Sequence, residues 1–266
     1  MYIFCCLIFI RLNPILLRKF RDMLGPLHPH ALIPVNTTVT STTLASSLTT
    51  QLRQDIIKGV FAPGSRLRTK ELAERYGTSL IPMREALSRL ASSGFVRAED
   101  QRGFSVPPVS KEELSDITQT RVHIETEALR RSIEHGDLAW ESALIAAHHR
   151  LSRLAMVSSA QAGIDPDWEL AHAAFHRALL SACDSPWLLN LSQLLRDQTA
   201  RYRHLSIQPA MTGKSAKGKG PKRDVAAEHQ ALVEAAVARD AETATELLRQ
   251  HFIATTDLAL NASGKV

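Results

Sequence analysis

The segment at residues 70–96, KELAERYGTSLIPMREALSRLASSGFV, constrains the fold more than any other part of the chain. Its first part has the pattern of a short helix, which Gly77 can end in a left-handed conformation. Ser79 is a suitable N-cap for a second helix. Apolar residues then repeat at i, i+3, i+4 and i+7, as a core-facing stripe does: Met83, Ala86, Leu87 and Leu90. Two short helices joined by a tight turn predict a helix-turn-helix, whose second helix can enter the major groove of DNA.

The flanking residues extend this pattern to a winged helix over residues 41–108. Upstream, an i, i+4 apolar stripe predicts another helix: Leu44, Leu48, Leu52 and Ile56. Downstream, residues 95–96 and 104–106 are short β-prone runs, and the polar residues 99–103 between them predict a hairpin tip. Arg102 and Gly103 at this tip are placed to reach a phosphate or the minor groove. We therefore expect three helices plus a β-hairpin; the alternative is a helical subdomain with surface arginines.

The charge is distributed unevenly between the two halves of the chain. Residues 41–108 hold ten Lys and Arg against six Asp and Glu, a net charge of +4, whereas residues 109–266 hold eighteen against twenty, a net charge of −2. The positive charge thus lies in the half that would meet phosphate. A basic composition is weak support by itself, because many basic proteins never bind nucleic acid.

The second half, residues 109–260, has the pattern of an all-helical antiparallel bundle. After the linker residues Pro107 and Pro108, Ser110 and Glu113 form a capping box for a helix over residues 111 to about 134. Five more helices are expected after capping residues, the one after Ser185 running to about residue 205: Asp137, Asp165, Ser185, Asp224 and Asp240. Residues 208–223, rich in Gly, Lys and Pro, predict a loop. The fold class is therefore mainly α.

Four histidines fall on the apolar faces of these helices. His172 and His176 are one turn apart, and His229 and His251 lie in line with core positions of two later helices. Neutral imidazole is a common ligand of divalent transition metals. Two ligands from one helix and one from each of two others would fill a closed four-ligand shell, and three would leave an open position. The alternative is that each is a hydrogen-bonded core residue.

The remaining histidines are weaker candidates. His148 and His149 point about 100° apart on a helix and cannot chelate one ion from one face. We expect His149 to be solvated. His28 and His30 lie in the N-terminal extension.

Four motifs in order, IIKGVFAPGSRL, KELAERYGTS, PMREALSRLASSGFV and RGFSV, resemble the DNA-binding domain of the GntR family of bacterial transcription factors. The resemblance covers about residues 44–108. It implies DNA contacts from four residues: Lys70, Ser79, Arg84 and Gly103. The family often has an arginine just after the turn serine, where this chain has Leu80. The missing guanidinium removes a possible bidentate contact with guanine.

The segments HAAFHRALLSACDSPWL, AAEHQALVEAAVARDAETA and LLRQHF resemble the helical ligand-binding domain, called FCD, of the FadR branch of that family. This resemblance implies a Zn or Ni site formed by an Asp, a His four residues later and two distant His. His176, His229 and His251 match, but His172 stands at the usual Asp position, which leaves the fourth ligand open. A more nitrogen-rich site favours Zn, Ni or Cu over Mg or Ca.

Similar domains bind small carboxylates beside the metal, with a cation nearby. Arg121, in the motif RVHIE, matches the family's arginine, and we expect it to clamp the effector carboxylate with its guanidinium. The alternative is a structural salt bridge with Glu125, one turn on. Arg201 and Arg203 are weaker candidates of the same kind.

Together these patterns predict a homodimeric regulator, more plausibly a repressor, that binds a double-stranded operator and is released by a small carboxylate. A metal-dependent enzyme is the rival class, but the sequence has no His-Glu-x-x-His motif, catalytic serine elbow or phosphate loop. A third alternative is a regulator with a purely structural metal.

Residues 1–40 predict a poorly ordered extension and are a candidate upstream start-codon artefact. Their apolar run is interrupted by Arg11 and is too short to span a bilayer. Positive charge follows the apolar run, whereas a signal peptide has it before. A membrane anchor is the alternative. Cys5, Cys6 and Cys183 give no disulfide framework, which fits a reducing cytoplasm. We expect a cytoplasmic protein without a membrane partner.

Overall fold

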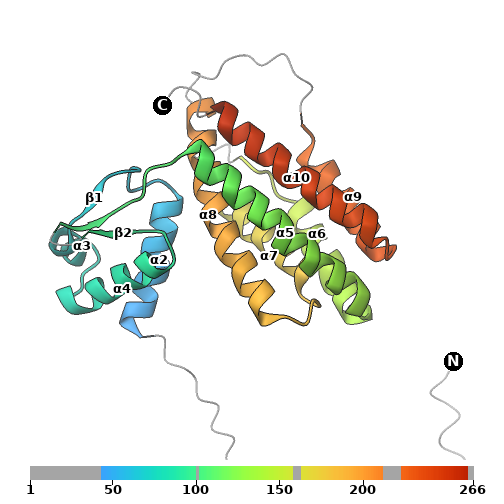
Figure 1. The fold of residues 1–266 in the computed structure, drawn as a ribbon, viewed down its shortest axis with the longest axis horizontal. Helices are drawn as coiled ribbons and strands as arrows, with labels where there is room; N and C mark the ends of the chain where they lie inside the picture. Colours follow the sequence, from blue (N-terminus) through green and yellow to red (C-terminus); the bar gives the residue numbers. More distant parts are fainter. Residues whose placement is uncertain (1–42, 100–101, 158–162, 212–222, 263–266) are drawn as a thin grey trace, which may run out of the picture. The chain divides into compact units, whose positions relative to one another are not determined.

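The computed structural model describes residues 43–99, 102–157, 163–211 and 223–262. The predicted extension at residues 1–40 lies outside this part, as do residues 212–222 of the predicted loop. The described residues form nine helices and one three-stranded sheet (Figure 1). The predicted fold class, a winged helix-turn-helix followed by a helical bundle, is confirmed. None of the described helices is long and apolar enough to cross a membrane.

The winged helix begins with α2 (Leu44–Ile57), where the hydroxyl of Thr43 accepts a hydrogen bond from the backbone N–H of Ser46. The helix-turn-helix follows as α3 (Thr69–Arg75) and α4 (Leu80–Ser92). Gly77 lies between these helices with a φ of 61°, which fits the predicted turn. The four predicted stripe residues of α4 are fully buried and pack against α2: Met83, Ala86, Leu87 and Leu90.

The wing has one strand more than the sequence predicts. β2 (Arg97–Glu99) and β3 (Gly103–Ser105) form the expected hairpin, and β1 (Arg66–Leu67) pairs antiparallel with the other side of β3. A strand of two residues is too short to show the period-2 alternation by which strands are found. β2 begins two residues later than expected, because Phe95 and Val96 are core residues that precede it, and β3 begins one residue earlier, at Gly103.

The second half consists of six helices: α5 (Lys111–His135), α6 (Leu138–Ser152), α7 (Pro166–Leu180), α8 (Pro186–Met211), α9 (Val225–Val237) and α10 (Ala241–Ala262). Side chains of Ser110, Asp137, Asp165 and Asp224 cap their helices as predicted. α8 extends to Met211, about two turns beyond the expected end and into the predicted loop, even though Pro209 lies in this stretch. α5 packs against both α8 and α10 (Figure 1).

α8 also contacts the winged helix. Asp197 forms an ion pair of 3.4 Å with Arg53 of α2, and the Gln198 side-chain amide donates to the Ser93 carbonyl at 3.0 Å. The buried Arg201 donates to the carbonyl of Pro107, in the linker. Among the described residues, α8 is therefore one helix through which the bundle contacts the DNA-binding domain.

Candidate metal centre

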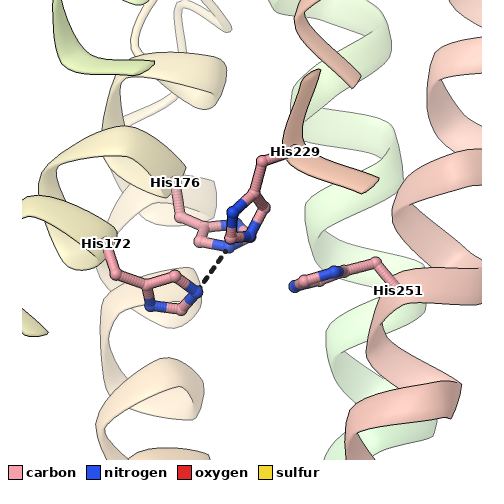
Figure 2. A group of neighbouring side chains, drawn as sticks. All are labelled: His172, His176, His229 and His251. Carbon is pink, nitrogen blue, oxygen red and sulfur yellow. Dashed lines mark hydrogen bonds between the residues drawn. The ribbon is translucent and has the colours of Figure 1, made fainter. Parts of the chain in front are cut away.

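The four predicted histidines converge in the bundle. His172 and His176 extend from α7, His229 from α9 and His251 from α10, and their rings are directed toward one another (Figure 2). One ring nitrogen from each lies within 4.8 Å of all the others. The Nε2 atoms of His172 and His176 are 3.2 Å apart. Three separate helices thus present four potential ligand atoms to one point.

α7 supplies two of these rings because it starts at a fixed place. The Asp165 carboxylate accepts hydrogen bonds from the N–H groups of Asp167 and Trp168, and Pro166 occupies the first turn. Trp168, one turn before His172, stacks on its ring with centroids 4.5 Å apart. This packing fixes the orientation of His172, the residue whose role as a ligand was left open by the sequence.

Burial keeps the four imidazoles neutral. His176, His229 and His251 are buried, and His172 is partly buried. Burial, reinforced by neighbouring positive groups, holds the pKa of His172 and of His176 well below the usual range, and it lowers the pKa of His229 to about 3. Burial also lowers the pKa of His251. A neutral imidazole is the form that binds a metal.

One ring nitrogen lacks a partner. Nε2 of His229 is buried and has no hydrogen-bond partner among the described residues. Leaving a buried polar atom unpaired costs about 1–3 kcal/mol. An unpaired nitrogen that faces three other imidazoles fits a metal ion, which can bind all four at once. The residues present therefore fit the Zn or Ni site that the sequence predicts.

An outer layer orients His251. A carboxylate oxygen of Glu228 lies 2.7 Å from Nδ1 of His251, so Nδ1 carries the proton and Nε2 is left with its lone pair. Arg223 holds Glu228 at 2.5 Å and donates to the backbone carbonyl of His251 at 3.1 Å. Although burial alone would raise it, the hydrogen bonds from His251 and Arg223 hold the pKa of Glu228 at about 2. Such carboxylate–histidine pairs are typical of metal sites.

Sequence reasoning missed Glu228 and Arg223. Glu228 is 23 residues from His251 in the chain, and Arg223 is 28 residues away. Contacts of this kind depend on how α9 packs against α10 and leave no spacing pattern. The only local signal was that Glu228 immediately precedes His229.

Arg121 lies beside the cluster in an ion pair. Its Nε is 2.8 Å from Glu125, both side chains are buried, and the guanidinium lies 3.9 Å from the centroid of the Phe252 ring. The alternative interpretation, a salt bridge with Glu125, is thus seen in the structure. After burial, the charge of Arg121 is among the causes that lower the pKa of His172, His176 and His251.

The two weaker arginine candidates differ. Arg203 forms an ion pair with Glu169, and its charge contributes to the lowered pKa of His172, so it belongs to the surroundings of the cluster. Arg201 instead holds the linker carbonyl of Pro107. The expectation that Arg201 resembles an effector-binding residue is therefore not supported, because its guanidinium is engaged with the linker.

The other histidine candidates of the sequence fall on α6 or outside the described residues. His149 is exposed on α6, as predicted, and the ring of His148 packs against Phe175 with centroids 5.7 Å apart. His28 and His30 lie outside the described residues.

The four predicted DNA contacts are all exposed: Lys70, Ser79, Arg84 and Gly103. Ser79 is the N-cap of α4, and Arg84 lies in its second turn. Gly103 opens β3 with a φ of 87°, which is a conformation that glycine adopts readily. Among the residues that the structure describes, neither Lys70 nor Arg84 forms an ion pair, so both charges are available to a phosphate or a base.

Comparison with known families matches both halves of the chain. Residues 44–106 match the family described as bacterial regulatory proteins, gntR family, and residues 116–254 match the FCD domain. Among curated proteins, the HTH-type transcriptional regulator BphR of Paraburkholderia xenovorans is 42% identical over 206 residues, which is 76% of this chain and 79% of BphR. The HTH-type transcriptional repressor GlaR of Escherichia coli is 37% identical over 202 residues, which is 76% of this chain and 89% of GlaR.

Solved structures support the fold. E. coli McbR/YncC superposes with a TM-score of 0.64 at 24% identity, covering 82% of this chain and 97% of that protein. A GntR-type regulator of Rhodococcus sp. RHA1 gives a TM-score of 0.59 at 22% identity, covering 81% and 97%.

Proposed function

Because the chain belongs to the GntR family of bacterial DNA-binding transcriptional regulators, with an FCD domain after its winged helix, we propose that it is a repressor released from its operator by a small carboxylate that binds beside a metal ion in the bundle. It is a regulator and not an enzyme. GntR regulators bind DNA operators, and FCD domains bind small-molecule effectors. The name of GlaR, and that of the probable D-xylose utilization operon repressor of Paenarthrobacter nicotinovorans, 27% identical over 228 residues, favour repression.

The convergence of His172, His176, His229 and His251 carries this proposal. These residues would hold the metal, and their nitrogen-only donor set favours Zn or Ni. When bound, the metal would supply a Lewis-acid centre that favours a carboxylate oxygen.

The surrounding arginines supply the second half of the carboxylate site. Arg121 and Arg203 are each paired with a buried or half-buried glutamate, Glu125 and Glu169. One oxygen of each glutamate is buried without a hydrogen bond among the described residues. An incoming carboxylate can compete for the same guanidinium groups, since arginine pairs with any carboxylate of suitable geometry. Binding would then rearrange ion pairs on α5, α7 and α8.

α8 offers a route from this site to the DNA-binding domain. Arg196 and Arg203 on α8 pair with Glu125 and Glu169 in the bundle. On the same helix, Asp197 and Gln198 contact the winged helix. A shift of α8 would therefore reposition the recognition helix α4. In the proposed homodimer, two such helices bind half-sites about one DNA turn apart. A small shift of α4 changes the distance between them, so that they no longer match the two half-sites. The effector acts only through its different affinity for two conformations, one that binds DNA and one in which the recognition helices are displaced.

Thermal unfolding of the full chain tests the metal and effector together. We expect a chelator to lower the Tm, Zn²⁺ or Ni²⁺ to restore it, and some member of a panel of small mono- and dicarboxylates to raise it further only when metal is present. The double variant His176→Ala, His229→Ala should lose both responses. His149→Ala, which removes an exposed histidine of α6, is the matched control.

The alternative function, a regulator with a purely structural metal, gives a different result. In that case the chelator lowers the Tm but no carboxylate raises it in the metal-loaded protein. A Tm that is indifferent to both chelator and metal would refute the metal site itself.

A further inference from the structure

Two large aliphatic side chains lie exposed at the start of the recognition helix. Ile81 is 80% exposed and Leu80 is 51% exposed, in the first turn of α4. Core packing does not account for them, because the fully buried stripe of this helix begins only at Met83. Single exposed aliphatic residues are common on protein surfaces. Two adjacent ones at the end of a helix that reads base edges call for another explanation.

The charges around this pair fit DNA as the occupant. Arg84, one turn after Leu80, is exposed and forms no ion pair within the part of the chain that the structure describes. Glu85, the one acidic residue in α4, is paired with Arg89 at 2.5 Å, and Arg89 also donates to Ser46 of α2 at 2.8 Å. The acidic charge is thus neutralised on the side toward α2. The aliphatic pair is left beside an available cation at the positive, N-terminal end of the helix.

We propose that Leu80 and Ile81 read thymine through its C5-methyl group in the major groove. The proposal rests on the DNA-binding function of α4 and specifies the bases it prefers. The N-terminal residues of a recognition helix contact base edges. Neither side chain can donate or accept a hydrogen bond, so neither can satisfy guanine O6 and N7 or cytosine N4. The thymine methyl is the one apolar group on the floor of the major groove.

The competing occupant is a protein surface, such as a second copy of this chain. One chemical change in the DNA distinguishes a contact with thymine from a contact with a protein surface. Deoxyuridine pairs as thymidine does and lacks only the C5-methyl. If Leu80 and Ile81 instead contact a protein surface, replacing thymine by deoxyuridine should not change the affinity for DNA.

The experiment selects bound sequences from a randomised duplex pool with the full chain, then replaces thymines of the selected site by deoxyuridine one at a time. We expect at least one thymine per half-site whose replacement weakens binding about fourfold, the effect of removing one buried methyl-sized group. Leu80→Ala or Ile81→Ala should weaken binding to the thymine duplex and become insensitive to the same replacement. Leu138→Ala, which trims an exposed leucine on α6, is the matched control and should change nothing.

A second variant tests the same claim by gain of function. Leu80→Arg should shift the selected base at that position from thymine toward guanine, since a guanidinium binds guanine O6 and N7. Both positions are exposed, so an unchanged Tm is expected and shows that the variants fold.

The outcomes separate this inference from the function on which it rests. If no duplex is enriched or bound, DNA binding by the chain is refuted, and the inference with it. If a site is bound but every deoxyuridine replacement leaves the affinity unchanged, the DNA-binding function stands and the thymine contact is refuted. The thymine contact is also refuted if the Leu80 and Ile81 variants bind more weakly yet keep the full response to deoxyuridine.

Discussion

His229 shows what the metal centre requires at the scale of a single residue. Its Nε2 is buried without a partner among the described residues, and its pKa is lowered from an ordinary 6.5 to about 3. In the unfolded chain the same imidazole would titrate near its ordinary value. The folded protein without metal therefore binds fewer protons than the unfolded protein between these two pKa values, and its stability must fall as the pH falls through that window.

The first prediction follows from that sign. Between pH 7.5 and pH 5, His229 should cost the metal-free protein about 2 kcal/mol of unfolding free energy, because the unfolded state gains a proton that the folded state excludes. Urea unfolding at the two pH values measures this loss. His229→Asn should reduce the pH dependence, whereas His149→Asn, at an exposed site, should keep it. An unchanged dependence in His229→Asn would show that the histidine is not held neutral by the fold.

The second prediction concerns Glu228, which orients His251 through the hydrogen bond at Nδ1. Glu228→Ala should weaken Zn²⁺ binding about 10- to 100-fold, the usual effect of removing such a partner, while the four histidines remain. A competition titration with a chromophoric chelator measures the affinity. Glu246→Ala removes a half-exposed glutamate of α10 that pairs with Arg249, and it should have no effect. Equal affinities for the two variants would contradict the assigned role.

Sequence reasoning succeeded at this scale where a spacing encodes the contact. The four-residue interval between His172 and His176 places both rings on one face of any helix, and apolar neighbours showed that His229 and His251 point inward. The Glu228 and Arg223 contacts could not be predicted, because they depend on the packing of two helices against each other. The Arg121–Glu125 pair was found only as an alternative, since their spacing fits both a salt bridge and an effector clamp.

At the scale of elements, the helices were predictable because their ends carry strong signals. Asp137, Asp165 and Asp224 each stand where their helix begins. The misses are equally local: β1 has two residues, and α8 continues past Pro209, where the sequence predicts a loop. No local signal predicts the two sets of contacts that α8 makes. One set of its side chains contacts the winged helix, and another contacts the surroundings of the histidine cluster.

The third prediction tests that double role of α8. Gln198→Ala removes the hydrogen bond to the Ser93 carbonyl and leaves the histidines and Arg121 in place. We expect the variant to bind metal and DNA but to respond less to a carboxylate effector, because the bundle is coupled less tightly to α4. Fluorescence anisotropy of labelled operator DNA, with increasing effector, measures the response. Gln230→Ala, which trims an exposed glutamine on α9, serves as the control.

If Gln198→Ala and wild type release DNA at the same effector concentration and to the same extent, the contact between α8 and Ser93 does not transmit the signal. The coupling would then have to run through the other contacts of α8, which are the Asp197–Arg53 ion pair and the hydrogen bond from Arg201 to the Pro107 carbonyl.

At the scale of the whole molecule, the chain joins a proposed effector-sensing bundle to a DNA-binding winged helix. The winged helix carries the net positive charge of the chain's two domains, and the bundle carries the histidine cluster and its arginines. The proposal that a carboxylate at this cluster controls DNA binding is the central claim, because it requires the metal, the arginines, α8 and α4 to act together.

The most direct test measures DNA release by fluorescence anisotropy, using the carboxylate that raises the Tm most. Metal-loaded wild-type protein and His149→Ala should release operator DNA as the carboxylate is added. Chelator-treated wild type and the His176→Ala, His229→Ala variant should remain bound over the same range. Release by the carboxylate that persists in the double variant would contradict the claim, since the effector would then act at a site that does not involve the histidine cluster.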